Sequence, residues 1–536
     1  MILQIVNSIQ KKYKTSTLFQ FICHFLLLAL GIFLFGFSQP NLFLPKGCFI
    51  FSYIAYIPIF ILTLLLPWKT VWLYGFFYGF GCYCFYTYWL ATFHSLGIIV
   101  IAGMFGLQCV FEFLLLKLVT ILFKKNWWIC QWIIWCAYEY VKTLGFTGFH
   151  YGLTAYSHWQ ILPMIQVADI FSVWGLNAFI SFFSALLACF FVQYSSLRQF
   201  IREKKVYISL WVVCLFSILI YGFVSPVHYE TSPKKTVALI QQNSDPWKGG
   251  YSTYKKDLAT LKKLSDEALQ ENSQIDLVVW PETAFVPRIE WHYKQRNDRD
   301  KFNLVQDLLL YLDSKEVPFV IGNDYYNGVD DFNSVLYFTP KKNVIPPKPE
   351  MYFKMRLVPF TEYFPYKKLF PRIYQLLIDF DTHLWEPGTN PIVFTLDSAQ
   401  FGTPICFEDT FGYISRRFVN NGADFLVNIS NDAWSKSLAC QYQHLSMAVF
   451  RSIENRVSSV RATASGQTAI IDPNGKILAM AEPFKETYLV GDFPIYKGEK
   501  TLYTRFGDYL GVLFFMLALG IILVGIIRKL TIKENR

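Results

Sequence analysis

The stretch GTPICFEDTF, residues 402–411, places a cysteine directly after a short apolar run and directly before Phe-Glu-Asp. An apolar run of this length, bounded by Gly and Pro, is typical of a buried strand. The residues after it, 409–420, predict a helix that stops before Gly422. Cys406 is therefore expected near a helix N-terminus, where the dipole favours a thiolate. The alternative is a structural disulfide with Cys440.

The sequence on both sides of this stretch predicts an α/β domain. Polar helical segments at 251–273 and 438–456 alternate with short runs that are rich in β-forming residues. Such alternation implies layered helices and sheets. The expected strands are at 236–242, 275–280, 318–323, 404–407 and 424–430.

The rest of the chain is typical of a membrane protein. Of its 536 residues, 53% are hydrophobic and only 16% are charged. A membrane span takes about 20 mostly apolar residues. About eight runs qualify, at 17–37, 48–66, 71–92, 96–122, 127–144, 164–193, 206–225 and 509–528. A cleaved signal peptide is the alternative for the first run, but this run is long and no A-x-A site follows it.

These runs predict three parts of the chain. Residues 1–229 hold seven transmembrane helices, residues 230–505 form the α/β domain, and residues 506–536 hold a last helix and a tail.

The net charge of +10 maps to the ends of the apolar runs. This placement suits membrane anchoring and does not suit a nucleic-acid partner, which needs a basic face in a soluble domain. Lys and Arg also favour one side of the predicted spans, so the positive-inside rule places the N-terminus and tail in the cytoplasm and 230–505 in the periplasm. The basic residues are Lys11, Lys12, Lys14, Lys124, Lys125, Arg202, Lys204, Lys205, Arg528 and Lys529.

A cysteine nucleophile needs a base and a donor for the oxyanion. Neither His228, just before the α/β domain, nor the three histidines within it, His292, His383 and His444, lies in a setting that commends it as the base. Glu282 directly follows a predicted strand, where open α/β sheets place their ligands. Lys354 lies among aromatic and aliphatic residues, which is unusual for a surface lysine. The sequence has no CxxC or Cys/His cluster, so no metal or other cofactor is expected.

The motifs that carry these residues resemble a known superfamily. WPETAF (280–285), K-x-R-L-V-P-F-x-E-Y-x-P (354–365), CFED (406–409), NISNDAW (428–434) and RATASGQTAIIDPNGK (461–476) are similar to motifs of the carbon–nitrogen hydrolase (nitrilase) superfamily. Together with the predicted spans and EYVKTLGFTGFHYG (139–152), they resemble its membrane-bound branch, the apolipoprotein N-acyltransferases.

This resemblance implies an αββα sandwich attached to a polytopic membrane domain. It implies transfer of a fatty acyl group from a phospholipid, usually phosphatidylethanolamine, to the α-amino group of the diacylglyceryl-cysteine of apolipoproteins. The enzyme would lie in a bacterial inner membrane and use no cofactor. The implied residues are a Glu282–Lys354–Cys406 triad, supporting carboxylates Glu362 and Glu408, the backbone N–H of Phe407, and Trp247 at substrate entry.

Two other classes of protein remain open from the sequence. A membrane-tethered amidase or nitrilase that hydrolyses a small amide or nitrile would use the same triad. A transporter or structural membrane protein would carry an inactive binding domain, which the intact Glu, Lys and Cys set disfavours.

Overall fold

The computed structural model describes residues 13, 15–93, 95–379 and 383–534. Lys11, Lys12 and Lys14, which the sequence marks as membrane anchors, lie outside the described residues, as do the last two residues of the tail. The chain divides into two compact units. One comprises residues 1–160, 173–220 and 508–536, and the other comprises residues 161–172 and 221–507.

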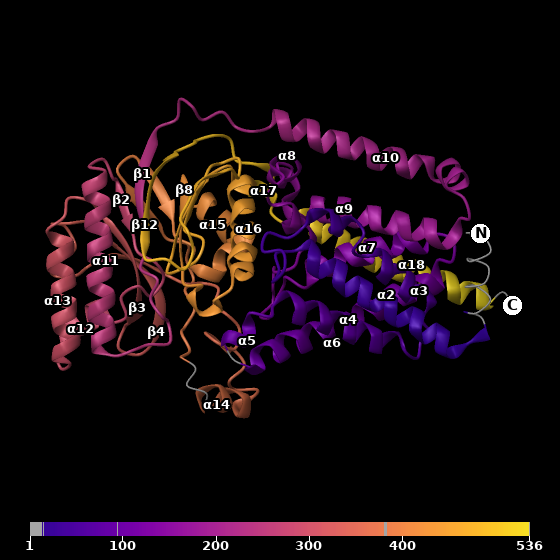
Figure 1. Cartoon of the computed structure of the whole chain (residues 1–536), viewed down its shortest axis with the longest axis horizontal. Helices are drawn as coiled ribbons and strands as arrows, with labels where there is room; N and C mark the ends of the chain where they lie inside the picture. The colour runs from indigo at the N-terminus through magenta and orange to yellow at the C-terminus, as the bar shows by residue number, and fades with distance from the viewer. Residues whose placement is uncertain (1–12, 14, 94, 380–382, 535–536) are drawn as a thin grey trace. The chain divides into compact units, whose positions relative to one another are not determined.

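The first unit is built of helices (Figure 1). Among the described residues, five helices of the chain are long and apolar enough to cross a membrane. These are α2 (Thr17–Ser38), α6 (Ser95–Leu122), α9 (Ala168–Gln193), α10 (Leu197–Val224) and α18 (Tyr509–Glu534). The chain is therefore a multi-pass membrane protein.

Three of the predicted spans form shorter helices than the sequence suggested. The run at 48–66 divides into a 3₁₀ turn, η1 (Phe49–Tyr53), and α3 (Ile57–Leu65), which has Pro58 in its first turn. The other two runs give α4 (Val71–Tyr86) and α7 (Trp127–Val141). The short elements α5 (Leu90–Phe93) and η2 (Thr154–His158) complete this unit.

Close helix packing holds α4 against α6. A Cβ atom at Gly75 would lie 2.5 Å from a carbonyl oxygen of α6, and one at Gly79 would lie 2.3 Å from another. Only glycine allows the two backbones to approach this closely. Nearby, the buried pair Lys142 and Glu139 joins at 3.1 Å, so these two charges within the apolar unit neutralise each other.

The second unit is an αββα sandwich. In Figure 1, α11 (Tyr251–Glu271), α12 (Ile289–Gln295) and α13 (Arg299–Asp313) cover one sheet, and α15 (Gly412–Asn420) and α16 (Leu438–Asn455) cover the other. The apolar faces of α11 and α13 pack on the first sheet in one buried cluster that includes Leu261, Leu308, Val278 and Phe319. The remaining short helices are α8 (Leu162–Ile165), α14 (Pro371–Asp379), η4 (Ala433–Ser435) and α17 (Leu502–Phe506).

Each sheet has six strands, and its central strands are parallel. The first has the order β12-β1-β2-β3-β4-β5 and the second β11-β10-β9-β8-β7-β6. Strands β1 to β3 are parallel to one another, as are β7 to β9. The strands are β1 (Lys234–Gln241), β2 (Leu277–Val279), β3 (Phe319–Tyr326), β4 (Asp331–Phe338), β5 (Glu350–Phe353), β6 (Val393–Leu396), β7 (Ala399–Gly402), β8 (Phe425–Ser430), β9 (Ser458–Thr463), β10 (Ala469–Ile471), β11 (Ile477–Met480) and β12 (Thr487–Pro494).

Aromatic side chains join the two sheets face to face. Tyr337 of β4 contacts Phe394 of β6 and Phe401 of β7, with ring centroids 5.5 and 5.4 Å apart. On the other side of the sandwich, Phe425 of β8 lies 4.9 Å from Phe493 of β12. These contacts fix the spacing of the sheets, and therefore of the loops that leave them.

The sequence is right about four strands and wrong at the opening stretch. The runs at 236–242, 275–280, 318–323 and 424–430 lie on β1, β2, β3 and β8. The run at 404–407 forms only an isolated bridge between Ile405 and Ile429, because Pro404 has no N–H to donate and Cys406 has a positive φ of 49°. The predicted helix at 409–420 is instead a 3₁₀ turn, η3 (Cys406–Thr410), followed by α15.

Candidate active site

Glu282 lies just beyond the end of β2 and is buried, with 5% of its surface exposed. Its Oε1 accepts hydrogen bonds from Lys354 Nζ at 3.0 Å and from Asn333 Nδ2 at 2.8 Å. Its Oε2 accepts one from the backbone N–H of Asn431 at 3.1 Å. Oε2 retains a lone pair that can accept a proton. The carboxylate is thus held in place while one oxygen stays able to act as a base.

Lys354 follows β5 and has no exposed surface. Its ammonium donates to Glu282 and, at 2.8 Å, to Glu362 Oε1, whose other oxygen accepts from the N–H of Val358. Burial lowers the pKa of Lys354, but the two carboxylates outweigh burial and hold that pKa well above its ordinary value. An ammonium has three donors, so one remains for a substrate oxygen.

Cys406 begins the turn η3 and is partly exposed. Its positive φ is uncommon for a residue with a side chain and is typical of strained functional sites. Burial and the negative charge of Glu282 raise the pKa of the Cys406 thiol well above its ordinary value, although Lys354 lowers it. The expectation of a thiolate at a helix N-terminus is therefore wrong, because α15 begins six residues later and a single 3₁₀ turn has little dipole. Because its pKa is raised, the Cys406 thiol needs a base if it is to act as a nucleophile.

Glu408 links the segment of the lysine to the segment of the cysteine. Its side chain has no exposed surface, and it accepts hydrogen bonds from the N–H groups of Met355 and Arg356 at 2.6 and 2.9 Å, and from Ile405 N–H at 2.8 Å. The hydroxyl of Tyr352 lies 2.8 Å from both of its oxygens. Burial raises the pKa of Glu408 to about 7, and these donors limit the rise.

His444 contacts the backbone of the candidate nucleophile Cys406, in a role that the sequence did not suggest. Its Nδ1 lies 2.8 Å from Asp432 Oδ2, and its Nε2 lies 2.6 Å from Asp409 Oδ1 and 3.2 Å from the carbonyl oxygen of Cys406. Asp409 also pairs with Arg461. Burial lowers the pKa of His444, but Asp432 and the Cys406 carbonyl raise it above its ordinary value.

Because both ring nitrogens of His444 face acceptors, the ring is a donor on each side. It therefore donates toward the carbonyl oxygen of Cys406 and is not placed to take the thiol proton. The sequence carries one signal for this contact: His444 lies on the helix directly after NISNDAW, the motif that contains Asp432.

The remaining predicted residues have less defined settings. The Phe407 side chain is buried and packs edge-on against Phe411, with ring centroids 4.9 Å apart. Trp247 lies in the loop after β1 and exposes 53% of its surface. Cys440 is buried in the first turn of α16, and both Cys406 and Cys440 are free, so the disulfide alternative does not hold.

Comparison with known proteins identifies two families along the chain. Residues 236–499 match the carbon–nitrogen hydrolase family, and residues 35–186 match the apolipoprotein N-acyltransferase N-terminal domain. The chain is 42% identical over 513 residues to "Apolipoprotein N-acyltransferase 1" of Treponema denticola, which covers 92% of this chain and 94% of the relative.

Two further relatives carry related names. The identity is 44% over 526 residues with "Apolipoprotein N-acyltransferase 1" of Treponema pallidum, covering 94% of this chain and 96% of the relative. It is 33% over 388 residues with "Apolipoprotein N-acyltransferase" of Geobacter metallireducens, covering 70% of each chain. This chain therefore belongs to the apolipoprotein N-acyltransferase family, and its candidate catalytic residues lie in a carbon–nitrogen hydrolase domain.

Proposed function

We propose that this protein transfers a fatty acyl group from a phospholipid, phosphatidylethanolamine, to the α-amino group of a diacylglyceryl-cysteine at the N-terminus of an apolipoprotein. Its family membership supports lipoprotein N-acylation, and its multi-pass helical unit supports lipid substrates. The observation that carries the mechanism is Lys354, whose buried ammonium donates to Glu282 and Glu362 and keeps one donor unused.

In the first half-reaction, Glu282 Oε2 takes the proton of the Cys406 thiol as the sulfur attacks the ester carbonyl carbon of the phospholipid. The carbonyl oxygen becomes an oxyanion, which Lys354 Nζ and the backbone N–H of Phe407 stabilise. When the tetrahedral intermediate collapses, the carbon–oxygen ester bond breaks. The departing lysophospholipid oxygen takes the proton from Glu282, and the acyl group remains on Cys406 as a thioester.

In the second half-reaction, the free α-amino group of the apolipoprotein attacks the thioester carbonyl. Glu282 accepts a proton from the amine, and Lys354 again stabilises the oxyanion. The carbon–sulfur bond breaks, the amide forms, and the Cys406 sulfur regains its proton from Glu282. Glu362 keeps Lys354 charged and in position throughout both steps.

We also propose that the protein lies in a bacterial inner membrane with residues 230–505 in the periplasm, where lipoprotein N-termini are exposed. The asymmetry of Lys and Arg among the predicted spans supports this orientation. A reporter that is active only outside the cytoplasm should be active when fused near residue 340 and inactive near residue 200. The reverse pattern would overturn the orientation and the access to substrates that depends on it.

The acyl-enzyme provides the direct test of the mechanism. The full-length protein incubated with phosphatidylethanolamine alone should gain one acyl mass on Cys406, and mild neutral hydroxylamine should remove it. Cys406→Ser should not turn over, whereas Cys440→Ser should load normally and serves as the matched control. An acyl adduct on Cys440 would disprove the assignment of the nucleophile.

Adding a synthetic diacylated lipopeptide to the loaded enzyme separates acyl transfer from hydrolysis. Acyl transfer requires the peptide to gain the acyl mass faster than free fatty acid appears. Release of free fatty acid alone would assign the chain to the hydrolases of the superfamily.

A further inference from the structure

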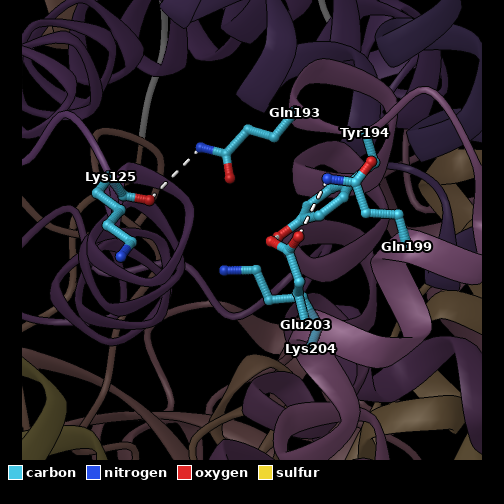
Figure 2. Close-up of a pocket in the computed structure, with 6 residues that line it drawn as sticks. All are labelled: Lys125, Gln193, Tyr194, Gln199, Glu203 and Lys204. Carbon is cyan, nitrogen blue, oxygen red and sulfur yellow. Dashed lines mark hydrogen bonds between the residues drawn. The ribbon is translucent and has the colours of Figure 1, made fainter.

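A polar pocket lies between two turns of the helical unit, and no step of the proposed reaction uses it. The cavity has a volume of about 390 Å³. Figure 2 shows the six side chains that line it: Lys125, Gln193, Tyr194, Gln199, Glu203 and Lys204.

Helix ends build this pocket at one boundary of the apolar helices. Helix α6 ends at Leu122 and α7 begins at Trp127, while α9 ends at Gln193 and α10 begins at Leu197. The Gln193 side chain donates to the carbonyl oxygen of Lys125 at 3.4 Å and so joins the two turns (Figure 2). The pocket therefore lies where long apolar helices end, at the level expected for lipid headgroups.

Lys204 is a buried cation that faces this space. Only 8% of its surface is exposed, and its ammonium lies 5.2 Å from the ring centre of Trp128 and 5.7 Å from that of Tyr207. Among the described residues, no carboxylate lies within ion-pair distance of Lys204 or of Lys125. Figure 2 shows the Lys204 ammonium extending toward the central space and the Lys125 side chain at its edge.

The single acidic side chain in the lining is already engaged. Glu203 accepts hydrogen bonds from Gln199 at 3.0 Å and from the Tyr194 hydroxyl at 3.2 Å. A buried cation without a counter-charge is costly unless an anion completes its surroundings. The lining thus has two cations for one anion, and both cations line the same pocket.

We propose that this pocket binds the phosphate of an anionic phospholipid headgroup, as a lipid that is held and not consumed. Phosphate oxygens would complete the surroundings of Lys204 and Lys125, and basic pockets between transmembrane helices are suited to such headgroups. A lipid fits better than free phosphate because α10 continues from the pocket with an exposed apolar stripe. This stripe, formed by Val206, Leu210 and Val213 with exposures of 60, 55 and 60%, can receive the acyl chains.

The test uses the full-length protein in detergent, titrated with phosphatidylglycerol and observed by native mass spectrometry. Lys125→Gln and Lys204→Gln should each weaken phosphatidylglycerol binding about fivefold, the effect of one lysine near a headgroup. Lys205→Gln is the matched control, because Lys205 is the next residue along α10, is exposed and does not line the pocket. Its affinity should change less than twofold, and zwitterionic phosphatidylcholine should bind all four proteins equally.

Two results would overturn the proposal. Equal weakening by Lys205→Gln would mean that the lipid senses only the general basic charge of this boundary. Displacement of phosphatidylglycerol by inorganic phosphate at equal concentration would mean that the pocket binds phosphate without regard to the lipid. Lys125 is exposed, so its variant keeps the test decisive even if Lys204→Gln fails to fold.

Discussion

Glu408→Gln tests whether the supporting carboxylate joins the two halves of the active site. The substitution keeps the size of the side chain but replaces one acceptor oxygen by an NH₂ group. In the better orientation, the amide oxygen keeps the N–H groups of Met355 and Arg356. The new NH₂ then faces the N–H of Ile405, and two donors oppose each other in a fully buried site.

The expected loss can be worked out from these contacts. Leaving a buried N–H unpaired costs about 1–3 kcal/mol, and the bonds that remain lose the strengthening that comes from a charged acceptor. Burying a neutral amide in place of a charge offsets part of this cost, so we expect a loss of about 3 kcal/mol in the free energy of unfolding. For a domain of this size, such a loss lowers the melting temperature by roughly 5 °C.

The assay is thermal unfolding of the full-length protein in detergent at pH 8, above the pKa of about 7 that burial gives Glu408. Acyl-enzyme formation should also slow roughly tenfold to a hundredfold, because the segments of Lys354 and Cys406 lose their common anchor. Tyr352→Phe removes only one hydroxyl donor and should cost less. Glu482→Gln, in an exposed surface pair, should leave both readouts unchanged. An unchanged melting temperature and rate for Glu408→Gln would refute the reasoning.

Three other predictions follow from the same site. Lys354→Arg should form the acyl-enzyme nearly as poorly as Lys354→Ala, since a planar guanidinium cannot place its donors where a compact ammonium did. If the Arg variant kept most of the wild-type rate, Lys354 would contribute only its positive charge. The rate of Cys406 alkylation by iodoacetamide should still rise with pH above pH 9, because the raised pKa of Cys406 keeps its thiolate fraction below that of a free cysteine. A rate that reaches a plateau below pH 8 would contradict this. His444→Asn should lower the free energy of unfolding by about 3–5 kcal/mol, because it leaves the buried Asp432 side chain without its imidazole donor and leaves Asp409 with Arg461 alone. Denaturant titration would show a smaller effect if the ring were only a packing element.

The sequence predicts the parts of this fold in which local pattern and burial agree. The central strands β1, β2, β3 and β8 are continuous apolar runs because both faces of each strand are covered. The outer strands are short or only partly buried, so their sequences lack a continuous apolar run. Strand β11, for example, alternates between partly buried and exposed residues and is only four residues long.

Residues that meet through the tertiary fold were harder to predict. Glu282, Lys354 and Cys406 stand out because each follows a strand or lies in an unusual setting. His444 does not stand out, since its two carboxylate partners come from 12 and 35 residues away and only the fold brings them together. The predicted direction of the pKa shift of Cys406 is wrong for the same reason. A nearby helix N-terminus favours the thiolate, whereas burial and the charge of Glu282, which only the fold reveals, favour the thiol.

The proposed triad is divided between the two sheets: Glu282 and Lys354 follow strands of the first, and Cys406 follows β7 of the second. The distance between these residues therefore depends on the spacing of the two sheets, which is set by the rings packed between them, such as Tyr337 against Phe401. Protein interiors are close-packed and hardly compressible, so the spacing between the sheets changes only when a side chain between them is replaced by one of another volume. A change of side-chain volume at these inter-sheet positions would therefore alter the distance between Glu282 and Cys406 without replacing either residue.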